Sequence, residues 1–479
     1  MERELVLETL GGVPILALLE DGEPREIVPV PPDAEPDVGS LYAGRVTRVV
    51  PGMRAAFVDI GASKNAFLPF DADEAPHQGD AVLVQAAKQP GGEKGLRVTR
   101  RVTLPGRLAV LRPGGACGVS AKIRDAQERA RLLGALQSLC PPGVGALART
   151  AAQGAGQDAL AQDLGALLAD WAAVQAAWRQ SQAPRCLRRA PHPAQRLLQD
   201  VLGPQLIRVV TDSSAWHARL AADLADWGPA NPPALALYRG ETPLSDLYPI
   251  RRALQDALRR KVWLPCGGYL VFDICEALTV VDVNTGKHTG AADTALAVNL
   301  QAALAVARQL RLRDIGGIVV VDFIDMDAPE SRQMLLDAFT QALAEDRAAV
   351  QFFGEISPFG LAQLTRRRLF TGLMDALTLP CPACRGAGHV PSPQATAREI
   401  WLQLARRAAS GEDTRWRVCA PSPVLQALLQ AGVPPAWQVL ARAQGPHRGE
   451  GFAIAPLGDE GDTGETGDIP LPSREEYDA

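Results

Sequence analysis

The sequence has no uninterrupted apolar stretch approaching the roughly 20 residues that a membrane-spanning helix needs. Its first eight residues, MERELVLE, carry charges where a signal peptide would have an apolar core. The length of 479 residues predicts two to four domains, and the hydrophobic content of 47% is ordinary for a globular chain. We therefore expect a cytoplasmic, multidomain protein without a membrane span.

An excess of positive charge is also missing, because the net charge is −5. However, residues 457–479 contain eight acidic side chains against Arg474, which leaves a charge of +2 on the preceding 456 residues. An acidic, glycine-rich tail of this kind is usually disordered. The mildly basic remainder permits an RNA partner without requiring one.

The eight cysteines lack the regular spacing of a disulfide framework, which favours a reducing compartment. Six are scattered, and we expect them to be small buried side chains. They are Cys117, Cys140, Cys186, Cys266, Cys275 and Cys419.

Cys381 and Cys384 form the one cysteine motif, CPACRGAG. Structural zinc takes four ligands, so a single chain offering two predicts that two protomers share one ion and form a dimer. A redox dithiol is an alternative, although its thioredoxin-type context is missing. A site made of Cys381, Cys384 and His389 would leave one ligand unassigned.

Short strands with glycine and proline punctuation are predicted in two places. Residues 3–9 and 13–19 flank Gly11 and Gly12 and indicate a hairpin. Residues 38–103 contain four or five short strands, as a small closed barrel requires. This stretch resembles an S1 domain, an OB-fold RNA-binding module, in which Phe57, Phe67 and Lys94 would lie on the binding face. Aromatic faces there stack bases. The alternative is that both phenylalanines belong to the barrel core.

Alternating strands and helices follow from Leu206 onward and indicate a mixed α/β layer. The apolar stripe Leu296, Leu300, Leu304 and Ala307 predicts an amphipathic helix. Helices are expected at 157–182, 243–260, 294–313 and 329–345, and strands at 269–274, 277–284 and 318–325.

Two of these strands end in carboxylates. Side chains alternate along a strand, so Asp282 and Asn284 share a face, and Asp322 would join them if the two strands are neighbours. Such oxygen ligands suit Mg²⁺, which can activate water at a phosphate. Turn or cap roles for Asp282 and Asp325 are the alternative. Burial of Asp322 in so apolar a strand would itself call for a cation or a partner.

Four segments are similar to the ribonuclease E/G family, in the family's order. They are WLPCGGY (263–269), CEALTVVDVNTG (275–286), ARQLRLRDIGGIVVVDFIDM (307–326) and CPACRGAG (381–388). The resemblance runs with gaps from about residue 3 to residue 390. It implies a Mg²⁺-dependent endoribonuclease that cuts single-stranded RNA.

The resemblance also implies site residues. Asp282 and Asp322 match magnesium-binding aspartates, and Asn284 matches an asparagine that orients the attacking water or the phosphate. Arg149 and Thr150 resemble a pair that captures a 5′-monophosphate. The family's zinc is shared between protomers through the cysteine pair, which agrees with the dimer; whether dimers pair into tetramers stays open.

The implied fold is a multidomain α/β protein, in which RNase H-like and DNase I-like regions accompany an inserted S1 (OB-fold) barrel. The expected divisions are an RNase H-like region (1–36 and 200–260), the S1 domain (37–103), a 5′-sensor-like region (104–199), a DNase I-like catalytic domain (261–378), a zinc link (379–390), a small C-terminal domain (391–456) and a disordered tail (457–479).

Departures from the family bear on the mechanism. The loop between Lys287 and Asp293 is shorter than in relatives. Gln301 and Gln363 replace usual glutamates, Ala349 replaces a basic residue near the 5′ phosphate, and Pro358 replaces an arginine. The metal aspartates are spared. The alternative functions are an RNA-binding relative with weak or no nuclease activity and a DNA-directed phosphodiesterase.

Overall fold

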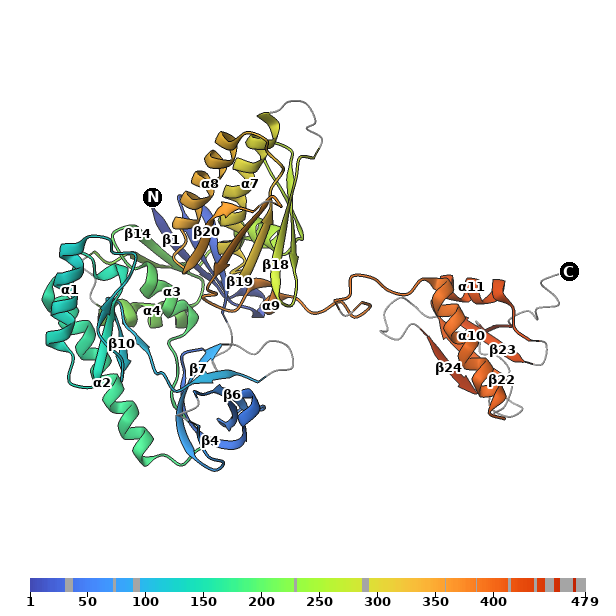
Figure 1. Ribbon diagram of the computed structural model, residues 1–479, viewed down its shortest axis with the longest axis horizontal. Helices are drawn as coiled ribbons and strands as arrows, with labels where there is room; N and C mark the ends of the chain where they lie inside the picture. Colours follow the sequence, from blue (N-terminus) through green and yellow to red (C-terminus); the bar gives the residue numbers. More distant parts are fainter. Residues whose placement is uncertain are drawn as a thin grey trace. The chain divides into compact units, whose positions relative to one another are not determined.

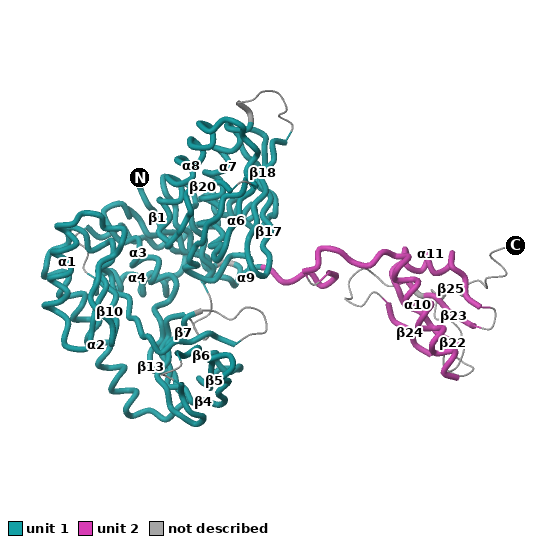
Figure 2. Tube along the Cα trace, viewed as in Figure 1, with its two compact units in different colours: residues 1–377 teal, residues 378–479 magenta. Residues whose placement is uncertain are grey.

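The protein is described by a computed structural model whose described residues form two compact units, 1–377 and 378–479 (Figure 2). The described residues are 1–30, 38–71, 75–88, 95–227, 231–286, 293–357, 359–384, 386–411, 415–434, 437–443, 452–456 and 468–470. In this part of the chain, no helix is both long and apolar enough to cross a membrane.

The first sheet of the larger unit has the strand order β15-β14-β1-β2-β3. Its strands are β1 (Arg3–Glu8), β2 (Ile15–Glu20), β3 (Glu23–Pro29), β14 (Leu206–Thr211) and β15 (Ala234–Leu237). The predicted hairpin is confirmed, because β1 and β2 pair antiparallel across the 3-10 turn Leu10–Gly12. Gly11 and Gly12 both have left-handed φ values there, which glycine adopts without steric cost.

Helices cover both faces of this first sheet. One face packs against α3 (Pro193–Val201) and α4 (Ser214–Trp227). The other packs against α5 (Leu244–Leu247), α6 (Ile250–Ala257) and α9 (Leu373–Leu377). The single helix predicted at 243–260 is therefore two helices, which are separated at Tyr248 and Pro249.

The β-rich stretch forms a closed barrel, as predicted, because β4 pairs with both β5 and β7. Its strands are β4 (Leu41–Val50), β5 (Ala55–Asp59), β6 (Ala66–Pro69), β7 (Ala81–Lys88) and β8 (Arg97–Thr99), with a 3-10 turn at Pro51–Met53. Val46, Val58, Leu68 and Val84 fill its centre. A further strand, β13 (Arg185–Arg188), pairs with the outside of β4.

A further sheet has the strand order β11-β12-β10-β9 and packs against two helices. We call this sheet and its helices the third layer. The elements are β9 (Leu104–Pro105), β10 (Ala109–Pro113), β11 (Gly118–Val119), β12 (Val144–Ala148), α1 (Ala126–Leu139), α2 (Gln157–Gln180) and a 3-10 turn at Thr150–Ala152. The predicted helix at 157–182 is α2. The stretch 104–199 also contributes β13 to the barrel and α3 to the first sheet, so it does not pack as one body.

The fourth sheet has the order β16-β17-β18-β19-β21-β20. Its strands are β16 (Lys261–Trp263), β17 (Tyr269–Ile274), β18 (Leu278–Asn284), β19 (Gly317–Asp322), β20 (Val350–Ile356) and β21 (Leu361–Arg366). Helices α7 (Asp293–Leu312) and α8 (Pro329–Ala344) lie side by side on one side of it (Figure 1). The strands and helices predicted between 269 and 345 are thus present.

The predicted apolar stripe of α7 is confirmed at Ala307, which is buried, and wrong at Leu304. Leu304 is 58% exposed, whereas Val298, Ala302, Ala303, Val306 and Leu310 are buried against the sheet. The buried face of α7 therefore combines small alanines with Val298, Val306 and Leu310, and it excludes Leu304.

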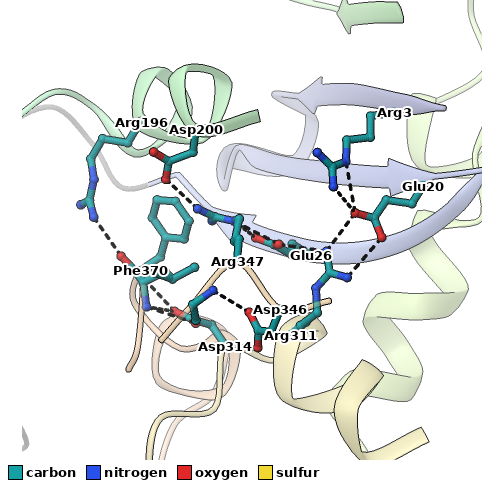
Figure 3. A network of polar contacts seen from close by, with 12 residues as sticks. Arg3, Glu20, Glu26, Arg196, Asp200, Arg311, Asp314, Asp346, Arg347 and Phe370 are labelled. Carbon is teal, nitrogen blue, oxygen red and sulfur yellow. Dashed lines mark hydrogen bonds and ion pairs between the residues drawn. The ribbon is translucent and has the colours of Figure 1, made fainter. Parts of the chain in front are cut away.

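A network of buried arginines joins the first sheet to the fourth (Figure 3). Arg311, at the end of α7, contacts Glu20 through two hydrogen bonds of 3.1 Å. Arg347 donates to Glu26 over 2.8 Å. Arg366 on β21 bonds both Asp314 and Asp346 at 2.7 Å and is almost fully buried. The charges are therefore paired where they are withdrawn from water.

The second unit contains the sheet β24-β22-β23-β25. Its elements are α10 (Pro393–Ala409), β22 (Arg415–Ala420), α11 (Ser422–Ala431), β23 (Gln438–Ala443), β24 (Ala453–Pro456) and β25 (Asp468–Pro470). Trp416 is buried at the centre of this unit's own apolar core.

Three residues of the tail that the sequence predicts to be disordered, Asp468–Pro470, form the strand β25. This strand pairs antiparallel with β23, whose edge is available for its backbone hydrogen bonds. Residues 457–467 and 471–479 lie outside the described residues.

Replacing Arg366 with methionine should destabilise the larger unit by about 3 to 5 kcal/mol, because Asp314 and Asp346 would be left as buried unpaired carboxylates. Urea denaturation followed by circular dichroism measures this. Arg368→Met is the matched control, since Arg368 makes an exposed ion pair with Asp375 and should cost less than about 1 kcal/mol. Equal losses in both variants would contradict the importance of the buried network.

Candidate active site

The fourth sheet has one covered and one open face. Val281 and Val283 of β18, and Val319 and Val321 of β19, point into the core with α7 and α8. The alternating positions lie on the opposite face, where Asp282 and Asp322 are exposed. The pleat therefore separates the apolar side chains from the carboxylates.

Asp282 and Asp322 are direct register partners in the parallel pair β18–β19. Asn284 lies two residues farther along β18, on the same face, and its Nδ2 donates a hydrogen bond of 2.8 Å to Oδ2 of Asp282. The expected convergence of these three side chains is thus present. Asp322 is exposed, because the strand ends at this residue on the open face, so the condition of burial does not apply to it.

Asp325 adds a third negative charge beside this pair. Partial burial of the Asp322 carboxylate raises the pKa of Asp322, and the charges of Asp282 and Asp325 raise it further. Gly360 leaves room for these groups, because a Cβ added there would lie 3.2 Å from Oδ1 of Asp325. The three carboxylates repel one another. This repulsion, and not burial of Asp322, is the argument for a cation at the site.

Asn299 of α7, which belongs to none of the motifs in the sequence, holds the segment after β19. Its side chain is fully buried and makes two hydrogen bonds with the backbone of Ile324, at 2.8 Å and 3.0 Å. The signal in the sequence is a polar residue three and four positions before the buried Ala302 and Ala303, on the apolar face of a helix.

Two glycines, Gly268 and Gly286, allow close packing of the backbone around Asn284. A Cβ on Gly268 would lie 2.8 Å from the carbonyl oxygen of Asn284, and a Cβ on Gly286 would lie 2.2 Å from that of Gly267. Gly286 also has a left-handed φ of 67°. Gln301 of α7 supports this turn, since its Oε1 accepts a hydrogen bond from the backbone N–H of Cys266 at 3.0 Å.

Within the described residues, no three His, Cys, Asp or Glu side chains are arranged to hold a metal together. The site therefore offers a facing pair of carboxylates and a neighbouring amide. This set fits Mg²⁺, which keeps several waters and binds proteins through one or two carboxylates.

Known proteins are similar to this chain over most of its length. The sequence model of the Ribonuclease E/G family matches residues 103–369. Ribonuclease G of Salmonella typhimurium (strain SL1344) is 38% identical over 416 residues, covering 82% of this chain and 85% of the relative. This chain belongs to the ribonuclease E/G family. The resemblance inferred from its motifs is thereby confirmed.

Other relatives carry both names of the family. Ribonuclease G of Escherichia coli (strain K12) is 37% identical over the same coverage. Ribonuclease E of Nostoc sp. (strain PCC 7120) is 37% identical over 77% of this chain and 58% of that protein. The chain thus spans a larger share of the ribonuclease G relatives.

The barrel of this ribonuclease E/G family member carries its two predicted aromatics outside the core. Phe57 and Phe67 are register partners and half-exposed, with ring centroids 6.1 Å apart. Arg48 pairs with Phe57, and Arg97 pairs with Phe67. We call this line of four the barrel row. The core alternative for the phenylalanines is wrong, and Lys94 lies outside the described residues.

Arg149 is held by neighbouring acceptors. Its Nη1 donates to the carbonyl oxygen of Gly106 at 2.6 Å, and its Nη2 bonds Asp200 of α3. Asp200 also pairs with Arg347. Thr150 is exposed and lies 3.4 Å from the Ser120 hydroxyl, oxygen to oxygen.

The cysteine motif lies in the second unit. Hydrogen bonds from the backbone of Gly386 and Gly388, and then from the Cys381 side chain, lower the pKa of the Cys384 thiol. A lowered thiol pKa favours the thiolate that binds metals. His389 is exposed.

The expectation that the other six cysteines are buried is wrong. All eight cysteines lie within the described residues and are free thiols. Cys186 and Cys275 are exposed, on the added strand β13 and in the turn after β17. The remaining four are only partly buried.

Some departures from the family pattern fall outside the described residues, namely 287–292 and Pro358. Gln363 is exposed on the open face. The loop change and the proline therefore have no structural account, whereas the glutamine faces the same side of the sheet as the carboxylates.

Asp322→Asn should raise the melting temperature in the absence of divalent cations, because it removes one of three mutually repelling charges. Mg²⁺ should stabilise the unmodified protein by mass action and leave the variant nearly unchanged. Thermal unfolding with Mg²⁺ or EDTA measures both effects. Asp273→Asn, which removes an ion pair with Arg260 on the same face, should keep the Mg²⁺ response. An identical Mg²⁺ response in Asp322→Asn would count against a metal site here.

Proposed function

We propose that this protein is a Mg²⁺-dependent endoribonuclease that hydrolyses single-stranded RNA in rRNA or tRNA maturation or in mRNA turnover. Its membership in the ribonuclease E/G family makes it an endoribonuclease. The observation that carries the finer proposal is the in-register pair of carboxylates with an adjacent amide on an open, exposed face. A long single strand could reach that face without entering a closed pocket.

Asp282 and Asp322 would hold the metal. Bound there, Mg²⁺ would supply an activated water and neutralise charge on the phosphate under attack. Asn284 already bonds Asp282 through its Nδ2, which leaves its Oδ1 as an acceptor for the attacking water. Water that attacks the phosphorus and displaces the 3′ oxygen would leave a 5′-phosphate and a 3′-hydroxyl.

The barrel row gives the RNA a second contact region, as an S1 domain would. Its two aromatic rings can stack bases, and the flanking guanidinium groups of Arg48 and Arg97 can neutralise phosphates. This arrangement supports the assignment of Phe57 and Phe67 to RNA binding. The first and fourth sheets would then be the family's RNase H-like and DNase I-like regions.

Sensing of a 5′-monophosphate by Arg149 and Thr150 would involve competition within the protein. Asp200 now accepts a hydrogen bond from Arg149, so a phosphate must displace that carboxylate or share the guanidinium with it. Because Ala349 offers no charge nearby, we expect a weaker preference for 5′-monophosphorylated RNA than a second basic residue would give.

The first test is cleavage of a 5′-monophosphorylated, A/U-rich single-stranded RNA with Mg²⁺. The unmodified protein should cut it, EDTA should stop the reaction, and Asp322→Asn should reduce the rate by at least about 100-fold because a metal ligand is lost. Asp273→Asn should stay within a few fold of the unmodified rate. End analysis should find 5′-phosphates.

The alternatives give different outcomes in the same assay. Tight RNA binding without cutting by the unmodified protein would instead identify an RNA-binding relative that lacks nuclease activity. Equal cutting of a DNA oligonucleotide would favour a DNA-directed phosphodiesterase. A 5′-hydroxyl version of the RNA measures the contribution of end sensing.

We also propose that Cys381 and Cys384 of two protomers share one structural Zn²⁺. Two thiolates from each of two chains complete the four ligands of such a site. The lowered pKa of the Cys384 thiol supports metal binding, and the free state of all eight cysteines agrees with a reducing, cytoplasmic environment.

The purified protein should contain one zinc per two chains and sediment as a dimer or as a pair of dimers. Cys381→Ser should lose the zinc and at least halve the mass, because two of the four ligands disappear. Cys275→Ser, at an exposed cysteine outside the motif, should change neither quantity. One zinc per chain would contradict sharing, and a reversible disulfide without zinc would favour the redox dithiol.

A further inference from the structure

The open face of the fourth sheet carries an exposed aromatic pair on its edge. Trp263 of β16 is 65% exposed. Its indole meets the ring of Tyr269 edge to face, with centroids 5.3 Å apart. The Nζ of Lys261 lies 4.0 Å from the Trp263 ring centroid and 3.4 Å from that of Tyr269. We call these three residues the edge cluster.

The strand register connects the edge cluster to the carboxylates. Trp263 pairs with Tyr269, and Tyr269 pairs with Asn284. Paired residues of antiparallel strands project from the same face. Trp263 therefore lies two strands from Asn284, about 10 Å at the usual strand spacing, on the side that carries Asp282 and Asp322.

Packing does not account for this exposure. The sheet buries its apolar side chains on the other face, under α7 and α8. A cation over aromatic rings at an exposed site contributes about 0.5 to 1 kcal/mol, and that contact does not require an indole left in water. A large aromatic face beside a cation is, however, the combination that binds a base and its phosphate.

We propose that Trp263, Tyr269 and Lys261 form a stacking platform for one base of the single-stranded RNA, close to the scissile phosphate. The proposal rests on the proposed function. Trp263 stacks the base, Tyr269 holds the indole edge to face, and Lys261 faces the adjoining backbone phosphate. Because every base has an aromatic face, the platform fixes the position of the strand with little selection of its sequence.

Binding measured without divalent cations tests the platform independently of cleavage. The affinity of a single-stranded oligoribonucleotide is measured in EDTA by fluorescence anisotropy. Trp263→Ala should weaken binding about 5- to 150-fold, the effect expected for one stacked base. Trp263→Phe keeps an aromatic face and should recover most of the affinity. Met334→Ala, at an exposed residue of α8 outside the open face, should have no effect.

A second readout locates the contact on the RNA. The fluorescent base 2-aminopurine, placed at successive positions, should be quenched at one position near the cleavage site, and Trp263→Ala should abolish that quenching. Lys261→Gln should lower the salt dependence of binding by about one phosphate contact. Circular dichroism of each variant checks that the sheet remains folded.

The outcomes separate the platform from the proposed function. If the unmodified protein binds RNA and Trp263→Ala, correctly folded, binds equally well, the platform is overturned while the nuclease proposal stands. If the unmodified protein binds no RNA, the proposed function itself fails. If Trp263→Ala changes the oligomeric mass and leaves the RNA affinity unchanged, the edge cluster is a contact between copies of the chain, which also overturns the platform.

Discussion

The candidate active site depends on the parallel, in-register pairing of β18 with β19, which places Asp282 beside Asp322. Both strands alternate strictly, and α7 and α8 cover the same face, so the valines must point one way and the carboxylates the other. A slip of one residue in this pairing would break the match between Asp282 and Asp322. The hydrophobic effect that buries the valines thus also assembles the charged site, although the charges repel one another.

The buried arginine network fixes the fourth sheet to the first sheet of the larger unit. Arg311 and Arg347 reach the glutamates of the first sheet, while Arg366 ties β21 to Asp314 and Asp346. From the third layer, Lys122 donates to the carbonyl oxygen of Asp346 at 3.0 Å. The region proposed to sense the RNA 5′ end is therefore bonded to the segment that precedes β20. A change at Arg149 has a physical route to the fourth sheet through Asp200 and Arg347.

Aromatic side chains flanked by cations occur on two surfaces, the barrel row and the edge cluster. In the barrel row, strand register pairs each arginine with a ring. In the edge cluster, Lys261 lies two residues before Trp263 on the same strand, and its Nζ lies over both rings. On both surfaces the apolar core lies on the other side of the strand. A chain with a net negative charge can thus offer local sites for a polyanion. Local arrangement, and not total charge, is what the RNA would meet.

The sequence by itself determined the family, the positions of most strands and helices in the fourth sheet, and the placement of Asp282, Asn284 and Asp322 near the ends of two strands. These follow from local periodicity and from motifs that lie close together in the chain. Asn299 was missed because its role depends on Ile324, which is 25 residues away. The α7 stripe was mispredicted at Leu304, because the face of the helix that meets the sheet carries Ala302 and Ala303 instead. Only the tertiary structure decided that Asp322 is exposed, that Arg149 is bonded to Asp200, and that Trp263 lies on the face of the carboxylates. Each of these depends on which strands and helices become neighbours, and the pattern of a single segment does not contain that information.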